Sequence, residues 1–214
     1  MFTGIIQELG EIVATKAKGG GLQLSIRADL ARQLKSGGSI NINGACQSAF
    51  DISDNCFYVW SSEETIGRTN FRGLRSGEKV NLELPLALSD PLGGHLVSGH
   101  IDDVGRITAL NRAGQGWLIQ IGFDPRYARH MIEKGSVAVD GISLTCYNLT
   151  DNAFSAAIIP ETYKKTNLRF RSIGDKVNLE FDLIAKYIEK LIAQKVGGVT
   201  LDYLSEHGYE VKHE

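Results

Sequence analysis

The sequence predicts an all-β dominated protein built from two tandem, homologous antiparallel barrels and a C-terminal amphipathic helix. Three observations lead to this fold class. The chain repeats itself at a nearly constant spacing, each copy is rich in short alternating apolar runs beside glycine turns, and an apolar stripe at helical period follows the second copy. The copies predict an N-terminal domain over 1–90, a C-terminal domain over 91–186 and a helical tail over 187–214.

The repeat is visible when the sequence is compared with itself. "ETIGRTNF" at 64–71 matches "ETYKKTNL" at 161–168, which is a shift of 161 − 64 = 97 residues. Near the start of each copy the shift is 98 − 3 = 95, because "TGIIQELGEI" at 3–12 matches "SGHIDDVGRI" at 98–107. One register over nearly a whole copy indicates a duplicated domain, with "LSDPLGG" at 88–94 as the joint.

Alternating apolar residues predict the strands. Leu22, Leu24 and Ile26 alternate after the glycine turn in "KGGG", and the second copy alternates in the same way over 117–121. This pattern is typical of hairpins with one apolar face. A small closed barrel is the favoured architecture, because closure removes the exposed edges of short antiparallel strands.

We expect one helix to interrupt each copy, and the second of these is better marked. Asp124 is its candidate N-cap, Pro125 takes the first helical position, and Gly135 follows its end. Past the second copy, "LIAKYIEKLIAQ" at 183–194 places its apolar residues on one helical stripe, and Thr200 is the candidate cap of a short final helix, "LDYLSEHGY". The stripe must be buried either against its own barrel or against helices of neighbouring subunits.

Composition and charge exclude several classes of protein. The net charge of −2 gives no electrostatic footprint for nucleic acid or an acidic membrane. The three cysteines, Cys46, Cys56 and Cys146, lack paired spacing, which favours a reducing compartment over a disulfide framework. The start "MFTGIIQELG" does not resemble a signal peptide, and no apolar run is long enough to span a bilayer. His95 and His100 lack a ligand cluster at metal-binding spacing, so no metal site is expected.

Polar clusters at equivalent places in the two copies are the candidate binding groups. Short hydroxyl and thiol side chains beside strand backbone can hydrogen-bond the edge of a flat heterocycle, so the duplication predicts two similar small-molecule pockets. The alternative is that these are strand-forming residues with locally satisfied hydroxyls, and that Glu64 and Glu161 are solvated surface charges. The clusters are Gly4-Ile5-Ile6, Cys46-Gln47-Ser48 and Glu64-Thr65 in the first copy, and Gly99-His100-Ile101, Ser143-Leu144-Thr145 and Glu161-Thr162 in the second.

Five motifs in order give the chain a close resemblance to riboflavin synthase, over about residues 1–195. They are "MFTGII" at the N-terminus, "GGHLVSGHID" (93–102), "VDGISLT" (139–145), "IPETYKKTNL" (159–168) and "VNLEFDLIAKYIEKL" (177–191).

The resemblance implies a fold, a reaction and an assembly. It implies two six-stranded Greek-key barrels per chain, each binding one lumazine, and a homotrimer held by the C-terminal helix. The active site would lie where the N-barrel of one subunit faces the C-barrel of another. Two molecules of 6,7-dimethyl-8-ribityllumazine would dismutate into riboflavin and 5-amino-6-(D-ribitylamino)uracil, the last step of riboflavin biosynthesis. The resemblance further implies a cytoplasmic transferase that needs no cofactor. In some relatives the enzyme lies inside a shell of lumazine synthase.

The same resemblance implies roles for single residues. Cys46 is the candidate for assisting addition at C7, or else a small buried hydrophobe. His100 is the candidate for proton transfer or for holding a water, with Ser143, Ser39 and Asp182 as further catalytic candidates. His130, His207 and His213 are expected on helix surfaces or in the tail. The N-barrel pocket would be lined by Gly4, Ile5, Ile6, Cys46, Gln47, Ser48, Trp60, Ser61, Ser62, Glu63, Glu64 and Thr65, and the C-barrel pocket by Gly99, His100, Ile101, Lys134, Ser143, Leu144, Thr145, Ile159, Pro160, Glu161, Thr162, Tyr163 and Lys164.

One motif departs from the family pattern. Where the first copy of relatives has Gly-x-Cys-Leu-Thr-Val, this chain has "GACQSAF" at 44–50. Gln47 therefore stands where the second copy has Leu144, and a buried unpaired amide would cost about 1–3 kcal/mol. The departure indicates either drift with a compensating partner or a changed ligand. The second possibility keeps open a non-catalytic lumazine- or flavin-binding protein of the antenna type, and a structural double-barrel module without ligand is the third alternative.

Overall fold

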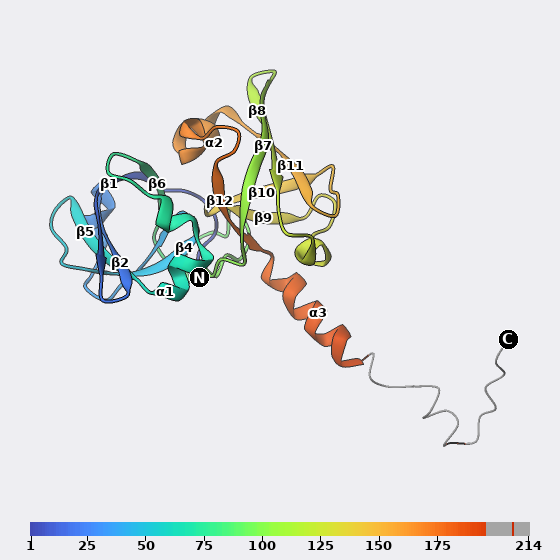
Figure 1. The fold of residues 1–214 in the computed structure, drawn as a ribbon, viewed down its shortest axis with the longest axis horizontal. Coiled ribbons are helices and arrows are strands. Elements are labelled where there is room, and N and C mark those ends of the chain that lie inside the picture. Colours follow the sequence, from blue (N-terminus) through green and yellow to red (C-terminus); the bar gives the residue numbers. More distant parts are fainter. Residues whose placement is uncertain (196–206, 208–214) are drawn as a thin grey trace.

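Two closed, six-stranded antiparallel barrels make up most of the molecule (Figure 1). The computed structural model describes residues 1–195 and 207. The neighbouring strands of the first barrel are β1-β2-β5-β4-β3-β6, and those of the second follow the same order as β7-β8-β11-β10-β9-β12. The strands are β1 (Glu8–Lys18), β2 (Gly21–Arg27), β3 (Ser39–Ile42), β4 (Ala45–Phe50), β5 (Cys56–Ser61), β6 (Lys79–Glu83), β7 (Asp103–Ala113), β8 (Gly116–Gly122), β9 (Ser136–Val139), β10 (Ile142–Tyr147), β11 (Ala153–Ile158) and β12 (Lys176–Phe181).

The strand order is that of a Greek key. Strands β3, β4 and β5 follow one another as antiparallel neighbours, and β6 returns after a long connection to lie beside β3. The predicted alternation sets the inner face, since Leu24 and Ile26 of β2 are fully buried in the first core. Ile119 and Ile121 of β8 are buried in the same way in the second core. The predicted pair of homologous antiparallel barrels is therefore confirmed.

Two-residue hairpins bring the barrels together. Asn43 and Gly44 join β3 to β4 with φ of 45° and 86°, and Asp140 and Gly141 join β9 to β10 with φ of 44° and 79°. Asparagine or aspartate followed by glycine suits these left-handed turn positions. The two turns pack against each other so closely that a Cβ on Gly44 would lie 2.9 Å from the Gly141 nitrogen. Any larger residue at this contact would push the barrels apart.

A buried asparagine network surrounds these turns and repeats the duplication of the sequence. The Asn70 N–H donates to the Asn178 side-chain oxygen, and the Asn167 N–H donates to that of Asn81, each at 2.7 Å. These contacts are equivalent under the shift of 97 residues. Because each bond crosses from one barrel to the other, the network fixes the barrels around an approximate two-fold axis.

The helical segments are shorter and more numerous than expected. The segment after Asp124 is a 3-10 helix, Pro125–His130, which ends before Gly135 because Met131 is extended and turns its buried side chain towards the core. Asp124 does cap it, accepting from the Arg126 N–H at 3.0 Å. Instead of one helix, each copy carries a short α-helix and two 3-10 segments. These are α1 (Glu63–Arg68), α2 (Pro160–Lys165) and the 3-10 segments Asp29–Gln33, Asn70–Gly73, Pro125–His130 and Asn167–Phe170.

Helix α3 (Leu183–Lys195) follows β12 directly and extends away from both barrels (Figure 1). Its apolar side chains Ile184, Tyr187, Ile188, Leu191 and Ile192 are all more than half exposed, so the described residues do not cover the predicted stripe. Within residues 1–195, no helix has both the length and the apolar character needed to cross a membrane. The short helix expected after Thr200 lies outside the described residues, except for His207.

Charged contacts hold the base of α3 to the second barrel. Glu189 pairs with Arg129 at 2.5 Å and also with His130, and Lys186 pairs with Asp102. The side chain of His130 is 10% exposed, so it is not the surface residue that was expected. It lies in this interface because its ring packs beside the buried Phe181 while its Nε2 meets Glu189.

Candidate functional site

The segment that precedes each barrel crosses over to the other barrel. The Gly4 carbonyl accepts from the Ser143 N–H of β10, and the Gly99 carbonyl accepts from the Cys46 N–H of β4, both at 2.8 Å. The sequence grouped Gly4–Ile6 with the first-copy clusters and Gly99–Ile101 with the second. The structure corrects this grouping, because the two loops are exchanged.

A buried carboxylate anchors each exchanged loop. Glu83 at the end of β6 accepts from the N–H of Thr3 at 2.6 Å and of Gly4 at 3.1 Å. Glu180 of β12 accepts in the same way from the Ser98 and Gly99 N–H groups, at 2.6 and 2.9 Å. Burial raises the pKa of both carboxyls above the usual range, although these hydrogen bonds favour ionisation. The anchors hold both loops in matching positions against the opposite barrel.

Glycine is required where each loop meets the opposite strand. Gly4 and Gly99 have φ of 77° and 85°. A Cβ on Gly4 would lie 2.7 Å from the Ser143 Cβ, and one on Gly99 would lie 2.6 Å from the Cys46 Cβ. The close approach places the loop backbone directly beside Cys46 and Ser143, which are two of the catalytic candidates.

In each barrel, two neighbouring strands are only partly paired beside this loop. Strands β4 and β5 are six residues each, yet they pair only at Ala49–Val59 and Phe50–Tyr58. Strands β10 and β11 likewise pair only at two positions. Residues 45–48 and 60–61 therefore face each other without a backbone ladder, and we call this opening the seam. Strand backbone beside a seam can hydrogen-bond the edge of a flat ligand in place of a neighbouring strand.

A cavity of about 170 Å³, the first pocket, lies beside the seam of the first barrel. It brings together Cys46 and His100, two predicted catalytic residues from opposite halves of the chain. Helix α1 forms one wall, with Ser62 as its N-cap accepting from the Thr65 N–H at 3.2 Å. The lining residues are Ala45, Cys46, Gln47, Glu64, Thr65, Arg68, Thr69, Gly99, His100 and Ile101.

Gln47 is buried but not unpaired. Its side-chain oxygen accepts from the Ser61 hydroxyl at 2.7 Å, and its Nε2 donates to the Cys46 carbonyl at 2.7 Å. Ser61, which lies across the seam on β5, is therefore the compensating partner for Gln47.

The matching place in the second barrel contains a histidine that the sequence interpretation left aside. His95 is buried, and its Nδ1 lies 2.8 Å from the Ser143 hydroxyl. Burial lowers the pKa of this imidazole, which keeps it neutral near pH 7. A neutral imidazole beside a hydroxyl can accept or donate the shared proton. The signal was present in "GGHLVSGH", but without the fold nothing connected His95 to residue 143.

Helix α2 and β8 form the wall of the second site. Trp117 stacks on Tyr163 with ring centroids 3.6 Å apart, and Ile159 is exposed beside the start of α2. Glu161 pairs with Lys165 at 2.7 Å rather than with a residue of the pocket. Leu144 is buried in the core. Of the remaining candidates on this side, Thr145, Lys164, Pro160 and Lys134 are exposed, and Thr162 is half-buried.

Other candidates lie at the edges of the two sites. Ser39 pairs with Ser48 across β3 and β4, and both are exposed on the outer face. Trp60 lies over Gly21, is 44% exposed, and donates to the Lys18 carbonyl at 2.9 Å.

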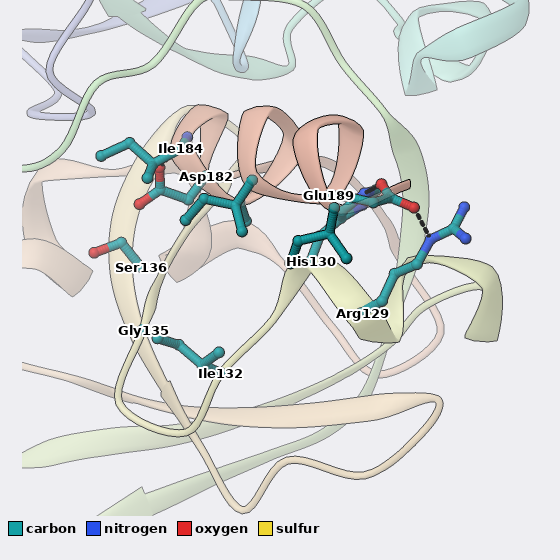
Figure 2. A pocket seen from close by; sticks show the side chains of 11 residues that line it. Arg129, His130, Ile132, Gly135, Ser136, Asp182, Ile184 and Glu189 are labelled. Carbon is teal, nitrogen blue, oxygen red and sulfur yellow. Dashed lines mark hydrogen bonds and ion pairs between the residues drawn. The ribbon is translucent and has the colours of Figure 1, made fainter. Parts of the chain in front are cut away.

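Asp182 lies in a separate, larger cavity. This cavity of about 560 Å³ lies between α3 and the second barrel. Figure 2 shows Asp182 and Ser136 at one end of it and the Arg129–Glu189 ion pair at the other. Asp182 accepts from the Ile184 N–H at 2.9 Å and so begins α3. The structure does not bring it into the first pocket with Cys46 and His100.

Comparisons with known proteins agree with this geometry. The model of the lumazine binding domain matches the chain twice, over residues 3–85 and 98–182. The riboflavin synthase of Actinobacillus pleuropneumoniae is 39% identical, covering 98% of this chain and 100% of its own. That of Bacillus subtilis is 35% identical over the same shares. Among solved structures, LumP complexed with riboflavin matches with a TM-score of 0.79 and 23% identity, over 85% of this chain and 99% of its own, which shows the shared fold.

Proposed function

Because the chain belongs to the riboflavin synthase family, we propose that it catalyses the dismutation of two 6,7-dimethyl-8-ribityllumazine molecules. One molecule donates a four-carbon unit and becomes 5-amino-6-(D-ribitylamino)uracil. The other accepts that unit and becomes riboflavin, so the enzyme is a transferase. The observation that carries the proposal is the pair of matching sites, each built at a seam and completed by the exchanged loop of the other barrel.

Two related pockets suit a reaction between two copies of one substrate. Holding both molecules in reacting geometry turns a bimolecular encounter into a nearly unimolecular step, which can be worth about 7–11 kcal/mol. The lumazine ring itself supplies the acidic 7-methyl group and the electrophilic C7 carbon. The protein has to orient the rings, exclude water and move protons, so no cofactor is needed.

Cys46 and His100 are the residues that would act on the substrate in the first pocket. They line the same cavity, and His100 is exposed, so its imidazole can reach a bound ring. We assign proton transfer to His100 and assistance of addition at C7 to Cys46. In the second pocket, Ser143 with His95 would orient the partner ring.

The assembly that we propose is a homotrimer formed through α3. The uncovered apolar stripe of this helix supports burial against the same helix of neighbouring subunits. In such an assembly the first pocket of one subunit faces the second pocket of another. Enclosure within a lumazine synthase shell is part of the same proposal. The three cysteines are free, in keeping with a cytoplasmic location.

A non-catalytic lumazine or flavin carrier is the second candidate, and Gln47 is the observation that favours it. Anaerobic incubation of the purified chain with 6,7-dimethyl-8-ribityllumazine separates the two functions. An enzyme forms one riboflavin for every two lumazines consumed, without added cofactor. Tight binding without riboflavin formation would refute the enzyme and support the carrier, and no binding would refute both.

A further inference from the structure

The two seams differ in one buried pair of side chains. In the first barrel, Gln47 of β4 meets Ser61 of β5 at 2.7 Å. Under the shift of 97 residues, the matching positions of the second barrel are 47 + 97 = 144 and 61 + 97 = 158, which are Leu144 and Ile158. All four side chains are buried, with exposed fractions between 1% and 7%. The first barrel thus has a polar pair of side chains, and the second has an apolar pair at the equivalent positions of the same fold.

Packing alone does not explain why the first barrel has the polar pair Gln47 and Ser61. Two hydrogen-bonded polar groups in a core contribute little net stability over apolar groups of similar shape, so a leucine and isoleucine pair would serve the first barrel equally well. The second barrel shows that this pair fits. Losing Gln47 would leave the buried Ser61 hydroxyl without its hydrogen-bond acceptor, and losing Ser61 would leave the Gln47 side-chain oxygen without its donor. The two positions are therefore coupled, and the coupling points to a use for the amide beyond filling space.

The Gln47 amide retains unused hydrogen-bonding capacity. A primary amide has two N–H donors and two acceptor lone pairs on its oxygen. Within the described part of the chain, Gln47 uses one donor on the Cys46 carbonyl and one lone pair on the Ser61 hydroxyl. One donor and one lone pair remain, on an amide whose orientation Ser61 and Cys46 fix. Gln47 is also one of the residues that line the first pocket, beside Cys46.

We propose that Gln47 determines the ligand specificity of the first pocket by binding the imide edge of a pyrimidinedione ring. An imide edge presents a carbonyl oxygen next to an N–H, which is the complement of the donor and lone pair that Gln47 retains. The second pocket has Leu144 at this place and cannot make these bonds. The proposal rests on the proposed function, since lumazines and flavins carry such an edge. It makes the two pockets unequal in ligand preference within one chain.

The experiment compares riboflavin with 3-methylriboflavin, in which a methyl group replaces the imide hydrogen. Each barrel contains one tryptophan beside its seam, Trp60 in the first and Trp117 in the second. Quenching of Trp60 in a W117F background reports the first pocket, and quenching of Trp117 in a W60F background reports the second. The test variant is Q47L/S61I, which gives the first barrel the apolar pair of the second and avoids an unpaired hydroxyl. The matched control is L144Q/I158S, which places the polar pair in the second barrel.

In the first pocket, we expect Q47L/S61I to bind riboflavin about tenfold more weakly and 3-methylriboflavin unchanged, as the loss of one or two hydrogen bonds predicts. In the second pocket, L144Q/I158S should gain a preference for riboflavin over 3-methylriboflavin. Matching unfolding curves for each variant and the parent chain check that the barrels remain folded.

The possible outcomes separate the inference from the proposed function. Unchanged riboflavin binding by Q47L/S61I, or an equal loss for both flavins, would overturn the role of Gln47 while leaving the proposed function intact. If the parent chain binds neither riboflavin nor 6,7-dimethyl-8-ribityllumazine in either pocket, the proposed function and the inference both fail.

Discussion

The ion pair between Asp140 and Arg171 breaks the symmetry of the interface between the barrels, and its removal tests how that interface is stabilised. The Asp140 side chain is fully buried and that of Arg171 is 14% exposed, with 2.7 Å between Oδ2 and Nη2. The first copy has Asn43 and Leu74 at the matching positions, 140 − 97 and 171 − 97. The chain therefore has a charged pair in the second copy and uncharged residues at the matching positions of the first.

We expect R171L to lower the free energy of unfolding by about 3 kcal/mol. Removing one partner of a buried ion pair typically costs about 3–5 kcal/mol, because the remaining charge is left uncompensated. The value lies at the low end here because Asp140 keeps hydrogen bonds from the Asn178 N–H at 2.8 Å and the Asn167 side chain at 2.7 Å. D140N/R171L recreates the uncharged pair of the first copy, so we expect it to lie within about 1 kcal/mol of the parent chain.

Denaturant unfolding followed by tryptophan fluorescence measures both variants, since Trp60 and Trp117 report one barrel each. In a thermal scan, a loss of about 3 kcal/mol corresponds to a fall in Tm of roughly 6–12 °C for a protein of this size. A loss below about 1 kcal/mol for R171L would refute the reasoning, as would a double variant that is as unstable as the single one.

Three further predictions concern the loops, their anchors and α3. G99A should lower both stability and activity, because its Cβ would meet the Cys46 Cβ at 2.6 Å; normal thermal unfolding and turnover would contradict this. Burial raises the pKa of Glu83 and Glu180, so their contribution to stability is full below the unfolded value near 4.5 and declines as pH rises through the raised folded pKa. Unfolding between pH 4 and 7 should show a shallower decline for E83Q, and identical slopes would count against it. I188E should convert the proposed trimer to monomers by light scattering, whereas trimers that persist in this variant would exclude α3 as the contact.

Much of the fold could be predicted because the sequence contains two copies of the same domain. The constant shift identified the duplication, and alternating residues such as Leu24 and Ile26 identified the inner faces. The local helices were harder, because a 3-10 turn and an α-helix begin with the same capping residues. Asp124 marked the start of such a segment correctly, but its end depended on where the core required Met131.

The composition of the candidate site was predictable, but its connections were not. Cys46 and His100 were both identified as candidates, yet the sequence placed them in different pockets, while the structure places them in one. Their presence in one cavity depends on the exchanged loop, in which Gly99 lies 99 − 46 = 53 residues after Cys46, and no local pattern encodes this pairing. Gln47 was recognised as a departure, but its partner Ser61 became apparent only when β4 and β5 were placed across the seam.

The exchanged loops have a consequence for how such a chain arose. A single ancestral barrel whose leading segment reaches into a neighbour could complete its pocket only as a symmetric homodimer, and the approximate two-fold axis between the barrels preserves that arrangement. Two such barrels joined in one chain keep both partners together, with the contacts at Gly4 and Gly99 in matching positions. The two halves are then constrained together, because a substitution in the leading segment of one half alters the pocket in the barrel of the other half.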